Sequence, residues 1–133
     1  MPPVELIRVP TLAAVPYAYA AVAPAGTRTV HLAGACPLDG HGAVVPVGDV
    51  EGQTRQALAN LRAALAAAGC TLTDVVRTRV LVASTDRADL GRAWAVVAET
   101  FGAHDVPSTL LGVTVLGWPD QLVEVEAVAA APA

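Results

Sequence analysis

The chain is 133 residues long, which is enough for one domain with a hydrophobic core and too short for two. Its formal net charge is −4, and its eight basic residues are all arginines with no basic run, which argues against a nucleic-acid partner. Hydrophobic residues make up 54% of the chain and charged residues only 15%, so we expect an oligomer that covers part of the apolar surface.

The N-terminal region lacks the features of a membrane span or a signal peptide. Its apolar stretch is interrupted by Pro16 and Pro24, at about half the ~20 residues that a spanning helix needs. The preceding MPPVELIRVP has one arginine, one acidic residue and three prolines, a poor start for a signal peptide. We therefore expect a cytoplasmic protein without membrane contact, in which Cys36 and Cys70 are free thiols.

In chain order, the first third of the sequence predicts three short strands. VELIRV and AYAAVA are the first two, and Pro10 and Pro16 bound the loop between them. TRTVHLAGA is the third strand. The run CPLDGHGAVVPVGD, rich in glycine and proline, is predicted to be a loop.

A long helix follows, from an N-cap at Asp49 to Gly69, a residue that suits the position after a helix end. TDVVRTRVLVAS is then predicted to be a strand, because it is rich in β-branched residues. A second helix is predicted from about Arg87 to Phe101, with an apolar stripe that includes Trp94. Apolar residues recur at helical spacing on one face of the first helix: Ala57, Leu58, Leu61, Ala64, Leu65 and Ala68.

The last two predicted strands are STLLGVTVL and QLVEVEAVA, joined through GWPD. The predicted order is β-β-β-α-β-α-β-β. Because strands separated by helices need crossover connections, we predict one α+β domain spanning residues 1–133, with one mixed sheet and both helices on one face.

The sequence gives little support for a metal centre or a nucleophilic enzyme. The three histidines are scattered and no Cys-x-x-Cys pair exists, so the ligand spacing of a zinc site is missing. Cys36 either faces a cleft or is a small buried hydrophobe, and the second interpretation is favoured because no basic residue adjoins it. We expect no metal and no cofactor.

An acidic pair near the C-terminus is more informative. Glu124 and Glu126 alternate with valines, so both carboxylates point to the same face of one strand. Such a face is either exposed to solvent, the commoner case, or lies at a subunit boundary where a carboxylate can take a proton from water or substrate. Trp118, just before a proline in a turn, is expected at a rim or an interface, whereas Trp94 is expected in the core.

Four stretches, in order along nearly the whole chain, carry the motifs of a known family. VPYAYA is similar to a Gly-Pro-Tyr segment, and VHLAGACPLDGHGAVV to a strand with a Ser-Gly pair and its loop. DVEGQTRQALANLRAALAAAGCTLTDVVRTRVLVAS is similar to a Gln-x-x-Gln/Arg-x-x-x-Asn helix, an Ala-Gly pair and the next strand. DVPSTLLGVTVLGWPDQLVEVEAVA is similar to the two final strands. Together these stretches resemble the reactive-intermediate deaminases, the Rid or YjgF-like family.

The resemblance implies a homotrimer of a chorismate-mutase-like fold, with helices outside, sheets packed toward the axis and small-molecule pockets at the three subunit interfaces. Typical members hydrolyse enamines and imines, such as 2-aminoacrylate and its imino tautomer, to 2-keto acids and ammonia without a cofactor. In these members an arginine anchors the carboxylate of the substrate, and a water held by a glutamate attacks the imine carbon.

The family's site residues are only partly kept in this chain. Tyr17 matches the pocket tyrosine, Gly34 matches the glycine of the Ser-Gly pair, and Glu124 matches the water-positioning glutamate. Among the positions that depart from the pattern, Ala33 replaces the serine of the pair, and Thr109 replaces the arginine. The resemblance therefore assigns catalysis to Glu124, Thr109 and Tyr17.

Four further residues complete the pocket that the resemblance implies. Trp94 stands at a helix position that is often asparagine, and Leu111 replaces a common cysteine. We also expect Cys36 and Trp118 to contact the substrate in this pocket. The tryptophan and the leucine would make the cavity more apolar than in typical members.

Three functions remain open on the sequence. The first is an enzyme for a larger, less acidic imine or enamine, with Glu124 as base or water-holder and with Tyr17 and Thr109 as hydrogen-bonding groups. The second is a trimer that binds a hydrophobic metabolite without turnover. The third is an ordinary deaminase in which Arg28 or Arg79 replaces the missing arginine. Loss of a bidentate ion pair would slow turnover of a 2-imino acid by about 10²–10⁴.

Overall fold

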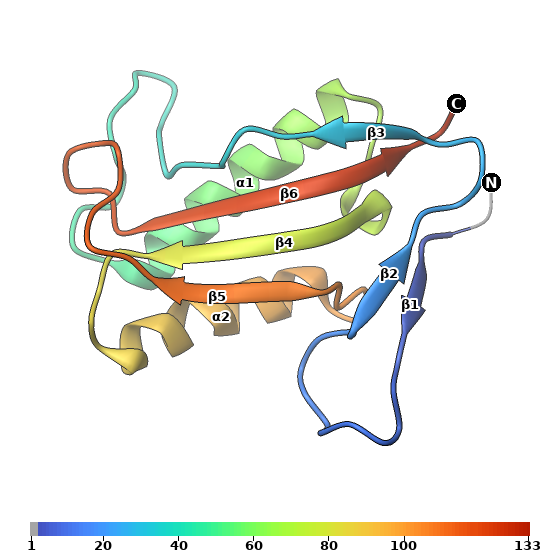
Figure 1. Cartoon of the computed structure of the whole chain (residues 1–133). Coiled ribbons are helices and arrows are strands. Elements are labelled where there is room, and N and C mark those ends of the chain that lie inside the picture. The colour runs from blue at the N-terminus through green and yellow to red at the C-terminus, as the bar shows by residue number, and fades with distance from the viewer. Residues whose placement is uncertain (1–2) are drawn as a thin grey trace.

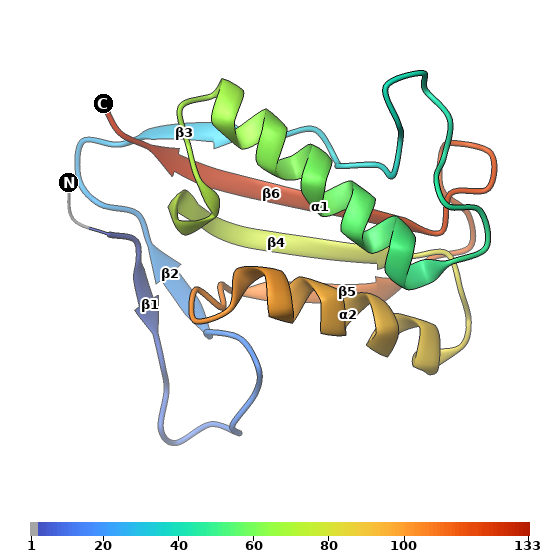
Figure 2. The same cartoon turned by 180° about the vertical axis from the view of Figure 1, so that it is seen from behind.

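The computed structural model describes residues 3–133, which form a four-stranded sheet and two helices that cover one of its faces (Figures 1 and 2). The order of helices and strands is the predicted one. A short 3-10 turn, Leu72–Asp74, precedes the fourth strand. The elements are β1 (Glu5–Ile7), β2 (Ala20–Val22), β3 (Arg28–His31), α1 (Val50–Ala67), β4 (Val75–Val82), α2 (Arg87–Phe101), β5 (Ser108–Gly112) and β6 (Val123–Ala131).

The sheet is mixed, with strand order β3-β6-β4-β5. β4 and β5 are parallel because α2 forms the crossover between them, and the other pairs are antiparallel. The α+β class and the two helices on one face are thus confirmed (Figure 2). No helix within residues 3–133 is long and apolar enough to cross a membrane.

The prediction of a single sheet is wrong for the first two strands. β1 and β2 pair only with each other, in a three-residue antiparallel ladder that leaves the corner of the main sheet (Figure 1). Pro24 and Gly26, the latter with a φ of +80°, redirect the chain between β2 and β3. β5 is also shorter than predicted and ends at Gly112, where a side chain would meet the carbonyl oxygen of Ser84 at 2.7 Å.

The first helix has the predicted ends. The Asp49 side chain accepts a hydrogen bond from Gly52 N at 2.9 Å, and Gly69 follows the C-cap with a φ of +77°. Its apolar stripe packs on the sheet with Leu61 and Leu65 fully buried, whereas Ala64, predicted on the same stripe, is exposed. The core therefore lies between the helices and one face of the sheet.

A buried amide joins α1 to the two loops at one end of the sheet. Gln53 is fully buried, and its Nε2 donates to the carbonyl oxygens of Pro46 and Asp120, both at 3.0 Å. Its Oε1 accepts from Leu122 N at 2.7 Å. One side chain thus fixes the Cys36–Asp49 loop and the Val113–Leu122 loop against the helix.

Asn60 continues this attachment about two turns further along the same face of the helix. Its Nδ2 donates to the carbonyl oxygens of Cys36 and Leu38, both at 2.8 Å, and Gln56 Nε2 donates to Leu38 O at 3.2 Å. Residues 53, 56 and 60 lie on one face because they are spaced by three and four positions. The Gln-x-x-Gln-x-x-x-Asn pattern of the sequence therefore positions the backbone at Cys36.

We predict that Gln53→Leu lowers the free energy of unfolding by about 2 kcal/mol, because three backbone groups lose a buried partner while the side-chain volume is nearly kept. Urea denaturation at matched protein concentration measures the change. Arg55→Ala, on the exposed side of the same helix, is the control and should change the free energy by less than about 0.5 kcal/mol. Equal effects of the two variants would contradict the role of the amide.

Candidate functional site

The face of the four-stranded sheet turned away from the helices, here called the open face (Figure 1), carries three of the predicted site residues: Glu124, Thr109 and Leu111. Alternate residues of β4 and β6 point into the core, where Val80, Val82 and Val125 are fully buried. The residues between them point to the open face. Strand register arranges them in two rows across β6, β4 and β5: Glu124, Leu81 and Leu111, then Glu126, Arg79 and Thr109.

Glu124 is the centre of a small group, here called the carboxylate cluster: Gly34, Cys36, Gln121 and Glu124. Its Oε1 accepts from Cys36 Sγ at 3.2 Å and from Gln121 Nε2 at 3.3 Å. Its other oxygen lies directly over Gly34, where a Cβ atom would collide with the carboxylate. The glycine is therefore required for this position of Glu124.

The segment around Gly34 is held beside β6 by backbone bonds. Ala35 N donates to Val125 O at 2.7 Å, and Val125 N donates to Ala35 O at 3.0 Å. Ala33, where the family has its serine, is exposed at the start of this segment and offers no polar group. The structure thus brings Gly34 and Cys36 to Glu124, as the sequence predicted for one pocket.

Cys36 is half-buried beside Glu124 rather than buried in the core, and Cys70 is buried; neither forms a disulfide. Burial raises the pKa of the Cys36 thiol to about 11, with further contributions from its hydrogen bond to Glu124 and from the negative charge of that residue. Cys36 therefore stays protonated at neutral pH. It acts as a hydrogen-bond donor to the carboxylate and not as a thiolate nucleophile.

A second group of predicted residues lines a groove along the free edge of β5, here called the tyrosine groove. Tyr17, Trp94 and Thr109 share it with Pro16, and its volume is about 490 Å³. The rings of Tyr17 and Trp94 meet edge to face, with centroids 6.0 Å apart. Trp94 is half-buried at this groove, so the expectation that it lies in the core is only partly met.

The carboxylate cluster and the tyrosine groove do not share a cavity within one chain. Thr109 lies on β5 and Glu124 on β6, with β4 between them. Two strand spacings separate their backbones by at least about 10 Å. The residues that the sequence assigned to one pocket therefore form two separate half-sites.

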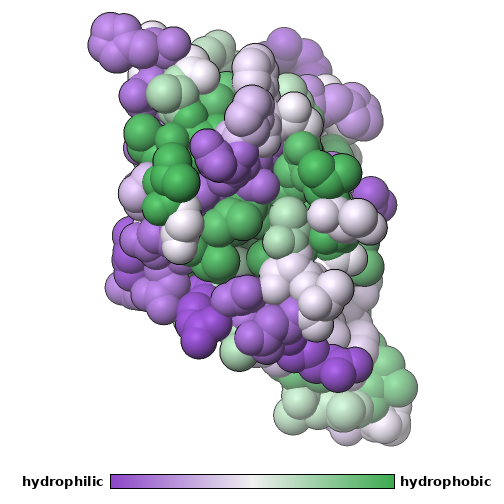
Figure 3. All heavy atoms as spheres, turned by 90° about the vertical axis from the view of Figure 1, so that its left-hand side faces the viewer, coloured by the Kyte–Doolittle hydropathy of each residue, from purple (hydrophilic) through white to green (hydrophobic). Residues whose placement is uncertain are grey.

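The remaining predicted residues, Leu111 and Trp118, lie near the end of the sheet. Leu111 is 41% exposed, and Trp118 is 49% exposed in the Val113–Leu122 loop, where Gln121 Oε1 accepts from its backbone N–H at 3.1 Å. Val47 and Val115 are exposed in the two loops at the same end. Figure 3 views this end, over which hydrophobic side chains gather in several patches among hydrophilic ones. Trp118 is thus an exposed loop residue at this end of the sheet, and its position at a rim or an interface stays a prediction.

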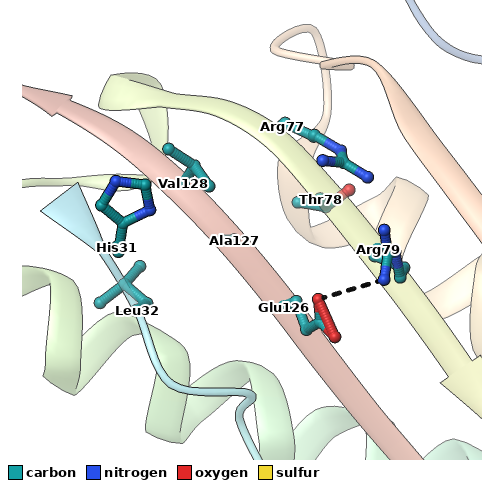
Figure 4. Close-up of a pocket in the computed structure, with 8 residues that line it drawn as sticks. All are labelled: His31, Leu32, Arg77, Thr78, Arg79, Glu126, Ala127 and Val128. Atoms are coloured by element: carbon teal, nitrogen blue, oxygen red, sulfur yellow. Dashed lines mark ion pairs between the residues drawn. The ribbon is translucent and has the colours of Figure 1, made fainter. Parts of the chain in front are cut away.

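A third feature of the open face joins Arg79 and Glu126, which the sequence indicated separately without predicting that they meet. Arg79 and Glu126 extend toward each other from neighbouring strands, with Arg79 Nη1 at 3.8 Å from Glu126 Oε2 (Figure 4). With His31 and Arg77 they line a depression of about 180 Å³. Arg28, the other arginine considered as a replacement for the missing one, lies at the far end of β3 and is within 3.4 Å of Pro132 O.

Sequence reasoning also missed Gln121, which connects Glu124 to the Val113–Leu122 loop. No local pattern marks this residue, since its role depends on the path of the loop. Among residues 3–133, no three His, Cys, Asp or Glu side chains converge as metal ligands would.

The two half-sites and the fold invite comparison with known proteins. A family model described as endoribonuclease L-PSP matches residues 9–131. The chain belongs to this family, the Rid or YjgF family. The predicted membership is thus confirmed.

Individual relatives agree with this assignment. A RutC family protein of Pyrococcus horikoshii is 37% identical over 98 residues, which cover 74% of this chain and 75% of the relative. A protein of the Rid family called YyfB from Yersinia pestis has a TM-score of 0.84 at 33% identity, covering 96% of this chain and 98% of that one. A YjgF/YER057c/UK114 family member from Mycobacterium tuberculosis has a TM-score of 0.65 at 33% identity, with 96% and 99% covered.

We predict that Cys36 reacts slowly with iodoacetamide at pH 8.5 and that Glu124→Gln increases the rate on the order of 3–10-fold. The substitution removes the negative charge that helps to raise the pKa of the thiol, while the burial remains. Peptide mapping by mass spectrometry separates Cys36 from Cys70. Gly34→Ala should act in the same direction, because the added methyl displaces the carboxylate.

The raised pKa also fixes the sign of a stability effect. The unfolded chain loses the Cys36 proton near pH 9, before the folded chain does, so this group's contribution to stability falls as the pH rises from 9 toward 11.

An unchanged alkylation rate of Cys36 in Glu124→Gln would contradict the alkylation prediction, because it would show that the carboxylate does not control the reactivity of the thiol.

Proposed function

We propose that the chain forms a homotrimer that acts on a small imine, enamine or related reactive metabolite in pockets between subunits. The observation that carries the proposal is the separation of the half-sites. Each is formed within one chain, but neither alone holds both the carboxylate and the tyrosine. A neighbouring subunit packed against the open face would join the tyrosine groove of one chain to the carboxylate cluster of the next.

The open face also carries apolar side chains of the kind found at subunit interfaces. It presents Leu81, Val128 and Leu111 between charged side chains, and the helices shield only the opposite face. A chain with 54% hydrophobic residues would gain from burying this face. A closed ring of identical subunits can bury this face in every subunit, because each subunit makes the same pair of contacts with its two neighbours.

Glu124 is suited to hold and deprotonate a water. One carboxylate oxygen is occupied by Cys36 and Gln121, and within residues 3–133 no group donates a hydrogen bond to the other oxygen. A water held there would add to the carbon of a C=N bond while Glu124 takes its proton. Glu124 then passes that proton to the nitrogen, which gives a neutral carbinolamine. As the C–N bond breaks, the hydroxyl proton is transferred to the leaving nitrogen, so ammonia is released and a carbonyl group remains. The overall step consumes one water and needs no cofactor.

The tyrosine groove would hold the rest of the substrate. The hydroxyl groups of Tyr17 and Thr109 can donate hydrogen bonds, and Trp94 supplies an apolar wall. Thr109 cannot form the bidentate ion pair of an arginine, so small 2-imino acids should be poor substrates. A larger substrate with more apolar surface fits these walls better.

The description of the matching family model names an endoribonuclease, and this activity is not part of the proposal. RNA binding requires a track of cations for the phosphates, and the chain has a net charge of −4 without a basic run. On the open face, Arg79 faces Glu126. Two other functions remain as outcomes of the test below: metabolite binding without turnover, and ordinary deamination of small 2-imino acids with a substitute arginine.

We predict that the wild-type protein releases ammonia from freshly generated 2-iminopropanoate at rates near background. Thr109→Arg should increase the rate by about 10²-fold or more, because it restores a bidentate partner for the carboxylate. Glu124→Gln in the same background should abolish the gain. Fast turnover by the wild type that disappears in Glu124→Gln would instead mean ordinary deaminase activity, and binding without any turnover would favour a non-catalytic role.

The assembly is tested separately. Sedimentation equilibrium should give three times the mass of one chain, and Leu111→Asp should dissociate the trimer because it buries a charge at the proposed interface. Ala63→Asp, on the exposed side of α1, is the matched control and should leave the mass unchanged. A monomeric wild type would contradict the proposed assembly.

A further inference from the structure

Arg79 lies directly beside the position where the arginine is missing. β4 and β5 are parallel, and their register pairs Arg79 with Thr109 on the open face. One strand spacing, about 4.8 Å, separates the two backbones. The cation is therefore not lost from this surface but lies one strand further toward β6.

The guanidinium of Arg79 has donors to spare. Its contact with Glu126 is 3.8 Å long, well beyond the 2.7–2.9 Å or so of a charge-assisted hydrogen bond, and both side chains are about 40% exposed. Within residues 3–133, no group accepts a hydrogen bond from the buried Nε of Arg79. An anion with two oxygens can satisfy Nε and a terminal nitrogen together, as carboxylates commonly do with arginine.

The surroundings of Arg79 favour an anion. His31 and Arg77 flank Val128 in the next row of the open face, and both line the same depression as Arg79 (Figure 4). Glu126 is the acidic residue that lines it. Two guanidinium groups therefore face one carboxylate, which leaves a net positive charge for a bound anion.

Moving the cation from β5 to β4 also changes the shape that the site accepts. A carboxylate bound at Arg79 leaves the space beside Thr109 free, and Thr109 itself lines the tyrosine groove of about 490 Å³ with its apolar walls. Resting on the proposed function, we infer that Arg79 is the substrate-binding cation of this protein and that the site selects 2-imino or 2-keto acids with a bulky apolar side chain.

Binding of stable keto acids tests the inference without requiring turnover. By isothermal titration calorimetry, the wild type should bind the 2-keto acid of leucine at least about tenfold more tightly than pyruvate, because the larger side chain fills the groove. Arg79→Gln should weaken both by about tenfold or more. Arg28→Gln removes the same charge at the far end of β3 and should change neither by more than about twofold.

Two further variants should change keto-acid binding in other ways. Glu126→Gln should tighten binding of both acids severalfold, because it removes the competing carboxylate. The double variant Arg79→Thr, Thr109→Arg moves the arginine from β4 to β5. It should bind keto acids more tightly than Arg79→Gln does but should prefer pyruvate. The carboxylate of the ligand then lies beside residue 109, in the space that a bulky side chain would need. If Arg79→Gln fails to fold, as judged by circular dichroism, these two variants decide the question.

Unchanged affinity in Arg79→Gln, a wild-type preference for pyruvate, or no binding of either acid at millimolar concentration would overturn the inference. Its failure is distinguishable from failure of the proposed function. Arg79-dependent binding without hydrolysis of the corresponding imine would refute catalysis alone, whereas Glu124-dependent turnover that persists in Arg79→Gln would refute the role of Arg79 alone.

Discussion

The buried side-chain amide of Gln53 is the contact on which the candidate site depends. It binds backbone groups of both loops at one end of the sheet, while Asn60 fixes the backbone at Cys36. These loops carry Cys36 and Gln121, the two donors that hold the carboxylate of Glu124. Because a buried amide that loses its partners is costly, helix, loops and carboxylate are ordered together. The chemistry of the open face thus depends on a polar contact from its opposite side.

Much of the fold follows from local sequence features. The ends of α1 are predictable because the N-cap at Asp49 and the glycine at Gly69 act within one turn of the helix. The separation of β1 and β2 from the main sheet is not, since strand partners are chosen by contacts far apart in the chain. β5 ends early, at Gly112, where the chain passes so close to Ser84 that no side chain fits, and no pattern in the sequence reveals this approach.

The candidate site was predictable to a similar extent. Alternation places Glu124 on one face of its strand, and the family resemblance selects Tyr17 and Gly34. That these residues form two separate half-sites depends on the strand order β3-β6-β4-β5, which composition and spacing do not determine. The position of Arg79 beside Thr109 depends on the register between β4 and β5, set by the crossover through α2. That Arg79 on β4 lies beside Thr109, the position where the family has its arginine, can be recognised only when this register is known.

The central claim is that two subunits complete each pocket, and a disulfide cross-link tests it most directly. In a Cys70→Ala background, Thr109→Cys places a thiol in the tyrosine groove while Cys36 marks the carboxylate cluster. Within one chain these positions lie on opposite sides of β4 and β6, too far apart for a disulfide, which needs Cα atoms within about 7 Å. Mild oxidation should therefore give covalent dimers and trimers on a denaturing gel, and these should vanish in Cys36→Ala. An oxidised trimer that yields only monomers with both thiols free would contradict the account.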